Sequence, residues 1–168
     1  MDQRSLDYAA GVLEEIDKAL RPIGMYLEQL DPAKVKGIPT GVIRPQAENS
    51  AWEISCSVVP THRDNVSTTF IQMLIVLTGP CPEQRREALE EYVRCRNSRL
   101  LLGTLVVLED RLCYKYTIAL EPAAALEQSH FQAAAFAFCQ QAELLSGLGQ
   151  DVCQGMRTVE EALADEKW

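Results

Sequence analysis

His62, Arg63 and Asp64 are the residues whose types and order most readily suggest catalysis. They spell the His-Arg-Asp tripeptide of the protein-kinase catalytic loop. That loop requires an asparagine five residues after the aspartate, where this chain has Thr69, and the sequence lacks both a glycine-rich phosphate loop and an Asp-Phe-Gly motif. Since His, Arg and Asp are all ordinary turn residues, we interpret the tripeptide as part of a hairpin turn over residues 60 to 65.

Nucleophilic catalysis would need a serine or cysteine beside a general base. The two histidines are His62, in the predicted turn, and His130, on a predicted helix. His62 could approach Cys56 or Ser57 across a hairpin, but the sequence shows nothing that would orient its second ring nitrogen. Neighbouring glutamates on a helix point some 100° apart and do not share a site. We therefore assign no catalytic residue and predict that the protein is not an enzyme.

Metal and cofactor sites are not expected either. The cysteines form no Cys-x-x-Cys motif or Cys/His cluster, so we interpret them as isolated small hydrophobic residues. They lie at positions 56, 81, 95, 113, 139 and 153. The segment Gly147-Leu148-Gly149-Gln150-Asp151 resembles half of a dinucleotide-binding fingerprint, but it follows a predicted helix where that motif must follow a strand. We interpret these glycines as the end of the helix.

The charge balance narrows the class of partner. With 16 Lys and Arg against 24 Asp and Glu, the net charge is −8, which disfavours binding to a phosphate backbone. Arginines between positions 85 and 99 are interleaved with glutamates, as on a solvated helix face. The amino-terminal residues lack the layout of a secretory signal, and the longest apolar run, within residues 70 to 77, is too short to span a membrane. We expect a cytoplasmic protein that binds neither nucleic acid nor membrane.

Apolar periodicity predicts the elements that would position any site. Spacing of three or four residues predicts helices over 5–20, from about 80 to 96, and from Glu121-Pro122 to Gly147. Alternation and β-branched runs predict strands over 52–58, 68–77, 100–108 and 111–120, with weaker candidates at 25–27 and 41–43. The chain thus reads as one α+β domain over 1–168, with an antiparallel sheet of about five strands, an N-terminal helix, a middle helix and a long C-terminal helix. Residues 151–168 read as a short acidic extension that includes a capping box at Thr158.

The segment from Arg96 to Tyr116, RNSRLLLGTLVVLEDRLCYKY, carries a family resemblance. Together with the order of elements, its helix-ending Asn97, its strand with Gly103, its turn and its second strand resemble the type III secretion chaperone-like fold shared by the YbjN-like family. The resemblance implies a small, acidic, non-enzymatic protein that forms homodimers and binds an extended polypeptide. In that setting Asn97 ends the helix, and Gly103 allows a close approach or a strong twist.

The leading hypothesis is therefore a cytoplasmic, dimeric, chaperone-like protein that holds a polypeptide client on sheet edges or in helix grooves. Apolar side chains in excess of what one sheet covers are the candidate interface residues: Tyr92, Val93 and Trp52. The alternative hypothesis is a metabolite-binding domain or enzyme. Its pocket would lie between the sheet and the C-terminal helix, with His62, Arg63 and Asp64 at the mouth.

Overall fold

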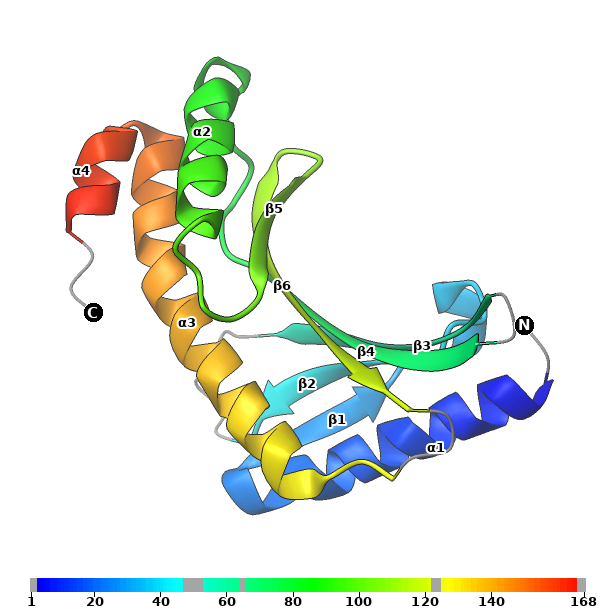
Figure 1. Cartoon of the computed structure of the whole chain (residues 1–168). Helices are drawn as coiled ribbons and strands as arrows, with labels where there is room; N and C mark the ends of the chain where they lie inside the picture. The colour runs from blue at the N-terminus through cyan, green and yellow to red at the C-terminus, as the bar shows by residue number, and fades with distance from the viewer. Residues whose placement is uncertain (1–2, 47–52, 64–65, 122–124, 166–168) are drawn as a thin grey trace. The chain divides into compact units, whose positions relative to one another are not determined.

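The computed structural model describes residues 3–46, 53–63, 66–121 and 125–165 of this α+β protein (Figure 1). Its described strands form a six-stranded antiparallel sheet in the order β1-β2-β3-β4-β6-β5. The strands are β1 (Met25–Gln29), β2 (Thr40–Pro45), β3 (Ile54–Arg63), β4 (Val66–Val76), β5 (Thr104–Leu108) and β6 (Arg111–Leu120). The α-helices are α1 (Gln3–Leu20), α2 (Arg86–Asn97), α3 (Gln128–Gln154) and α4 (Val159–Ala164), with 3-10 turns at Arg21–Ile23, Pro32–Val35 and Glu83–Arg85.

Contacts divide the chain into two compact units. Unit 1 comprises Met1–Leu74 and Thr117–Phe136, and unit 2 comprises Ile75–Tyr116 and Ala137–Trp168. Strands β4 and β6 and helix α3 each contribute residues to both units. One domain over 1–168 stays a prediction from the sequence, and each compact unit is described by itself.

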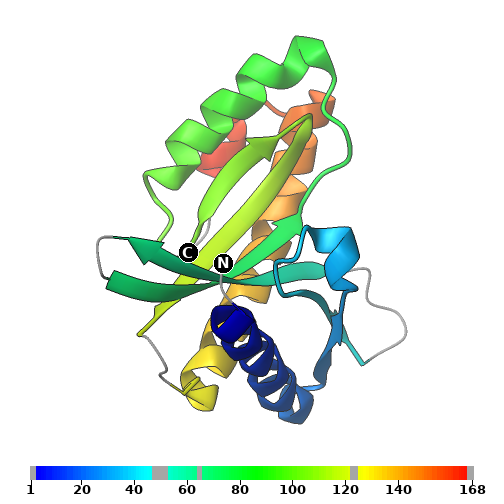
Figure 2. The ribbon, with the colours of Figure 1, turned by 90° about the vertical axis from the view of Figure 1, so that its right-hand side faces the viewer.

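In unit 1, α1 packs against β1 and β3 (Figures 1 and 2). Its buried side chains recur at helical spacing, as an amphipathic helix requires. They are Ala9, Val12, Leu13, Ile16, Ala19 and Leu20. Both weak strand candidates, 25–27 and 41–43, are strands, paired in a register that places Leu27 opposite Ile43.

The first four residues of the turn predicted over 60–65 belong to a strand instead. Strand β3 continues through His62 to Arg63, and β4 begins at Val66. The hydroxyl of Thr61 donates to the carbonyl of Thr68, and Nδ1 of His62 lies 2.9 Å from Oγ of Ser67. These contacts across the two strands hold His62 in the hairpin, while residues 64 and 65 lie outside the described part of the chain.

In unit 2, α2 runs beside the β5–β6 hairpin (Figure 2). The strand predicted from Leu100 begins only at Thr104, because Gly103 adopts a left-handed conformation with φ of 69° that interrupts an extended run. The residues before it, 98 to 102, form a loop after α2. This loop is one wall of the site described below.

Helix α3 starts and ends later than predicted. It begins at Gln128 and continues through Gly147 and Gly149 to Gln154. Gly149 is buried inside the helix, where an added Cβ would lie 2.4 Å from a methyl group of Leu112. That glycine therefore permits close packing of helix on strand and does not end the helix.

The residues predicted as an acidic extension are part of unit 2. Asp151 to Gln154 complete α3, with Val152 and Cys153 buried, and α4 contacts α2. The capping box is confirmed: the Thr158 side chain accepts from the N–H of Glu161, and the Glu161 carboxylate accepts from the N–H of Thr158.

Candidate functional site

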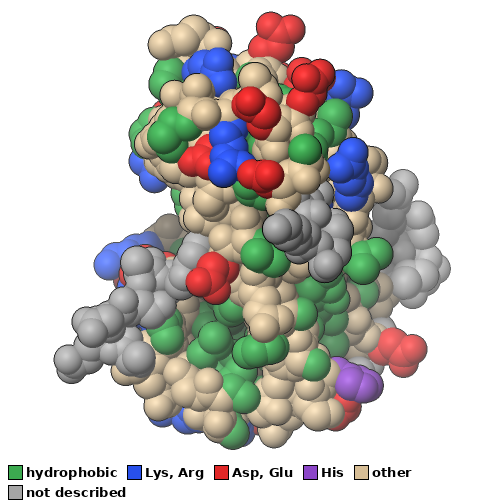
Figure 3. Space-filling view, turned by 90° about the vertical axis from the view of Figure 1, so that its left-hand side faces the viewer, with side chains coloured by type: hydrophobic (Ala, Val, Ile, Leu, Met, Phe, Trp, Pro, Cys, Tyr) green, Lys and Arg blue, Asp and Glu red, His purple; other side chains and the backbone are tan. Residues whose placement is uncertain are grey.

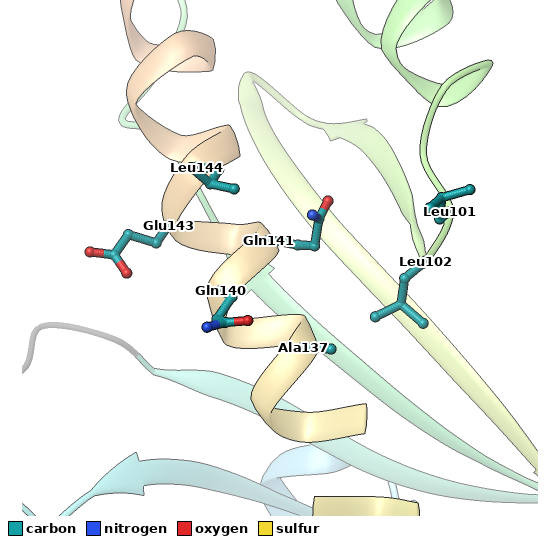
Figure 4. A pocket seen from close by; sticks show the side chains of 7 residues that line it. All are labelled: Leu101, Leu102, Ala137, Gln140, Gln141, Glu143 and Leu144. Atoms are coloured by element: carbon teal, nitrogen blue, oxygen red, sulfur yellow. The ribbon is translucent and has the colours of Figure 1, made fainter. Parts of the chain in front are cut away.

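A hollow of about 480 Å³ opens in unit 2 between the 98–102 loop and α3 (Figure 4). Seven residues line it: Leu101, Leu102, Ala137, Gln140, Gln141, Glu143 and Leu144. Gln141 extends from α3 toward the loop that carries the two leucines, and Glu143 points from the other side of the helix. The lining is thus mainly aliphatic, with two carboxamides and one carboxylate.

The helical wall of this hollow follows from sequence spacing. Ala137, Gln140, Gln141 and Leu144 recur at positions i, i+3, i+4 and i+7, so they share one face of α3. Phe138, Ala142 and Leu145 occupy the neighbouring buried face. The side chain of Leu144 is therefore left toward solvent, with 59% of its surface exposed.

The loop wall is fixed by Tyr114 on β6. Its hydroxyl donates to the carbonyl of Leu102 at 2.5 Å, and its ring stacks on Phe138 of α3 with centroids 4.7 Å apart. Burial, reinforced by Tyr116, raises the pKa of Tyr114 to about 12, although Arg96 opposes the shift. The hydroxyl stays protonated at neutral pH, so it keeps donating to Leu102 and holds both walls in place.

Gly103 is required by the same arrangement. An added Cβ would lie 2.7 Å from both the carbonyl oxygen of Lys115 and the ring of Tyr114. The predicted close approach at this glycine is therefore present. With the loop closely apposed to β6, Leu101 remains 97% exposed at the mouth of the hollow.

Asn97 lies at the end of α2, as predicted, and its side chain also binds the backbone of β5. Its side-chain amide donates to the carbonyl of Leu105 at 2.9 Å, and its side-chain oxygen accepts from the N–H of Leu105 at 2.7 Å. Both backbone groups of Leu105 face away from β6, because alternate residues of an antiparallel strand point to opposite sides. Asn97 thus occupies the outer edge of β5 near its start, at the second of its five residues.

The other outer strand, β1, is occupied in a similar way. The N–H of Leu27 donates to a carboxylate oxygen of Asp17 on α1 at 2.9 Å. Arg21 lies 2.7 Å from the other oxygen of that carboxylate. A polypeptide that adds to a sheet edge needs these backbone groups, so both edges are partly closed to strand addition.

The other residues singled out from sequence are spread over the two units. His62 lies exposed on β3, while His130 is exposed on α3 and pairs with Glu127 at 2.7 Å. Tyr92 is fully buried inside unit 2, Val93 is partly exposed on α2, and Trp52 lies outside the described residues. The structure brings none of the described members of this set into the hollow.

Most of the cysteines are buried. All six are free, and four of them are buried: Cys56, Cys81, Cys113 and Cys153. Burial raises the pKa of Cys56 to about 12, which makes its thiol a poor nucleophile at neutral pH. Within the described residues no group of three or more His, Cys, Asp or Glu side chains is placed to hold a metal ion.

The surface charges are mixed. On the face shown in Figure 3, red acidic and blue basic side chains are interspersed and form no continuous basic area. Nor does any α-helix in the described ranges combine the length and apolar character needed to cross a bilayer. What the site can bind is therefore inferred from its aliphatic and carboxamide lining.

Sequence reasoning missed the residues that line the hollow. The spacing of Ala137, Gln141 and Leu144 was a usable signal, since an exposed leucine on this face lies beside a buried stripe. Leu101 carried no such signal, because it reads as part of a strand until Gly103 is known to interrupt the extended run.

Comparisons with known proteins give no further assignment. No protein-family model matches the chain, and no curated protein sequence matches it. The resemblance of Arg96–Tyr116 to the YbjN-like family therefore stays a prediction from the sequence.

Proposed function

We propose that the protein binds a polypeptide segment in the hollow between the 98–102 loop and α3, without catalysing a reaction. The observation that carries the proposal is the exposure of two leucines at one lined hollow: Leu101 is 97% exposed and Leu144 is 59% exposed. Single exposed leucines are common, but two beside a preformed concave surface are typical of a binding site.

The lining favours a particular kind of segment. Leu101, Leu102 and Leu144 would accept aliphatic or aromatic side chains, and the carboxamides of Gln140 and Gln141 can pair with peptide N–H and C=O groups. Glu143 at the rim would attract a lysine or arginine of the segment. The net charge of −8 acts in the same direction by steering a basic partner toward the protein.

The two sheet edges are less suited to this role than the sequence hypothesis allowed. Asn97 occupies both backbone groups of Leu105, and Asp17 occupies the N–H of Leu27. Of the two modes in the hypothesis, the helix groove is thus the better supported. We retain the cytoplasmic location, supported by six free cysteines, and the homodimer, for which Val93 is a partly exposed candidate contact.

The second candidate function is binding of a small apolar molecule. Its specific support is the size of the hollow, since about 480 Å³ falls within the range of small-molecule pockets. The lining contains one carboxylate and no cation, which disfavours an anionic metabolite.

The test uses the full chain and fluorescein-labelled extended peptides in which leucines alternate with either lysines or glutamates, so that the peptide N–H and C=O groups stay free for Gln140 and Gln141. We expect the basic peptide to bind measurably by fluorescence anisotropy and the acidic one at least about tenfold more weakly. Leu144→Glu should weaken binding of the basic peptide about tenfold or more, because a carboxylate would enter the apolar lining.

Leu108→Glu is the matched control. Leu108 is also an exposed leucine, at 46%, but it lies at the end of β5 and does not line the hollow. This variant should bind the peptide within about twofold of the unmodified protein. Equal loss in both variants, or no binding of the basic peptide, would refute the proposal. A thermal shift with small apolar compounds that Leu144→Glu abolishes, in the absence of peptide binding, would establish the second function instead.

A further inference from the structure

The 98–102 loop carries the residue types that the hollow in unit 2 is suited to bind. Arg99 is exposed, and Leu101, two positions later, is 97% exposed. The hollow is lined by leucines, with the carboxylate of Glu143 at its rim. An exposed leucine close to an arginine matches such a lining, so the loop has the chemistry expected of the bound segment.

The loop presents these side chains on a fixed backbone. The N–H of Arg99 donates to the carbonyl of Arg96 at 2.9 Å, and the carbonyl of Leu102 accepts from the hydroxyl of Tyr114 at 2.5 Å. Leu101 lies between these two anchored residues. Binding through Leu101 would therefore need little further ordering of the loop, which lowers the entropic cost of association.

Within one copy, the loop and Glu143 face apart. Figure 4 shows Leu101 and Leu102 on one side of the hollow, whereas Glu143 points away from them on the far side of α3. A chain cannot fill the hollow with its own loop, because that loop is one of the walls. A second molecule is needed to bring an arginine and a leucine to this surface together.

We propose that two copies of the chain occlude each other's hollow about a two-fold axis. An axis through the hollow places the 98–102 loop of each copy over α3 of the other, on the side to which Glu143 points. Leu101 of each copy then packs on Leu144 of the other, which is 59% exposed, and Arg99 lies against Glu143. Each contact occurs twice, and these local contacts oppose the repulsion between two chains of charge −8.

The association regulates the proposed function, and this consequence rests on that function. Leu101, Glu143 and Leu144 cannot contact a second copy and a client peptide at the same time, so the two compete. By mass action, a higher protein concentration lowers the fraction of open hollows, and an excess of peptide returns the chain to the monomer.

Sedimentation velocity of the full chain without peptide tests the association at protein concentrations from about 1 to about 200 μM. We expect the sedimentation coefficient to rise with concentration from that of a monomer toward that of a dimer. Leu101→Glu should weaken the association at least about tenfold, because a carboxylate would enter the apolar contact. Leu108→Glu is the control and should stay within about twofold, since Leu108 does not line the hollow.

Charge reversal shows whether the contact joins two copies. Arg99→Glu and Glu143→Arg should each weaken the association at least about fivefold, because each places like charges together. Mixed in equal amounts, the two variants should associate to within about threefold of the unmodified protein, since unlike copies restore every contact between opposite charges. An interaction inside one chain would not be restored by mixing.

The outcomes separate this inference from the proposed function, with circular dichroism as the check that each variant is folded. A chain that stays monomeric, or a mixture that fails to associate, would overturn the inference and leave peptide binding untouched. Loss of association in Val93→Glu but not in Leu101→Glu would place the interface on α2 and also overturn it. Excess unlabelled basic peptide should dissociate the dimer, and binding of that peptide to a persistent dimer would refute the occlusion. Dimers that follow the variants as expected, with no peptide bound, would refute the proposed function alone.

Discussion

Two polar side chains, Asp17 and Asn97, bind backbone groups that face outward from the first and last strands of the sheet. Asp17 accepts from the N–H of Leu27, and Asn97 makes both a donor and an acceptor contact with Leu105. A hydrogen bond to a charged group contributes more than a neutral one, so the ionised form of Asp17 should matter for stability.

The Asp17 contact predicts how stability depends on pH. Burial raises the pKa of Asp17, but the N–H of Leu27 and the guanidinium of Arg21 together hold it below its ordinary value of 3.8. A carboxyl with a lowered pKa in the folded state stabilises the fold above its unfolded pKa and loses that contribution as the pH falls through the folded value. We expect Asp17→Asn to cost about 1 kcal/mol at pH 7 and progressively less below about pH 3.8.

Urea unfolding of both proteins at a series of pH values measures this difference. Glu14→Gln serves as the control, since Glu14 is an exposed carboxylate on the same helix. It should change the free energy of unfolding by no more than about 0.5 kcal/mol at pH 7. A difference between Asp17→Asn and the unmodified protein that does not shrink in acid would contradict the assigned role of the carboxylate.

At the residue scale, sequence reasoning reached Asn97 and Gly103 but only part of what they do. Asn97 was expected to end α2, and it lies in the last position of that helix. Its contact with Leu105 depends on a loop of six residues folding back, which no local pattern in the sequence encodes. For Gly103, a close approach or a strong twist was predictable, because a glycine within a run of leucine and β-branched residues often marks such a site.

At the scale of elements, two glycines differ in whether the structure leaves room for a side chain. Gly103 has a φ of 69° and faces Tyr114 and the carbonyl of Lys115, whereas an added Cβ at Gly147 on α3 would meet no atom within 4 Å. Most element types followed from apolar periodicity, because buried faces recur with the period of the helix or strand. The element boundaries predicted at Leu100 and Gly147 were wrong, because the true boundaries depend on contacts with other elements.

The paired substitutions Gly103→Ala and Gly147→Ala test this contrast. Gly103→Ala should destabilise the protein by at least about 2 kcal/mol, because it adds a left-handed alanine and a clash with backbone. Gly147→Ala should stabilise it by about 0.5–1 kcal/mol, because glycine is a weak helix former. Thermal or chemical denaturation measures both. If Gly103→Ala unfolds like the unmodified protein, the tight apposition of the 98–102 loop on β6 is absent.

At the scale of the whole molecule, the sheet is bounded by β1 in unit 1 and by β5 in unit 2. The sequence predicted the α+β class and the antiparallel sheet, since these follow from the order and type of elements. The number of strands was predicted only approximately, because the segments 25–27 and 41–43 are too short to show a clear alternation of apolar and polar residues. The spacing on α3 was a signal for one wall of the hollow, but the other wall is the 98–102 loop, which the sequence did not predict.

Because side chains occupy backbone groups on both outer strands, we predict that they hinder association of the protein through its sheet edges. An unprotected outer strand is a template for pairing with another chain. Here Asp17 binds the middle residue of β1, and Asn97 binds the second residue of β5. The double variant Asp17→Ala with Asn97→Ala should therefore show a mass that rises with protein concentration more steeply than that of the unmodified protein. Size-exclusion chromatography with light scattering measures this mass.

Destabilisation alone also promotes aggregation, so the comparison needs a variant that weakens the core and leaves the edges occupied. Leu89→Ala serves this purpose, because Leu89 is fully buried on α2 and its truncation should cost about 2–5 kcal/mol. At temperatures where the two variants are equally folded by circular dichroism, the double variant should associate and Leu89→Ala should not. Equal association would mean that loss of stability, and not release of the strand edges, drives the process, and the two side chains would then have no protective role.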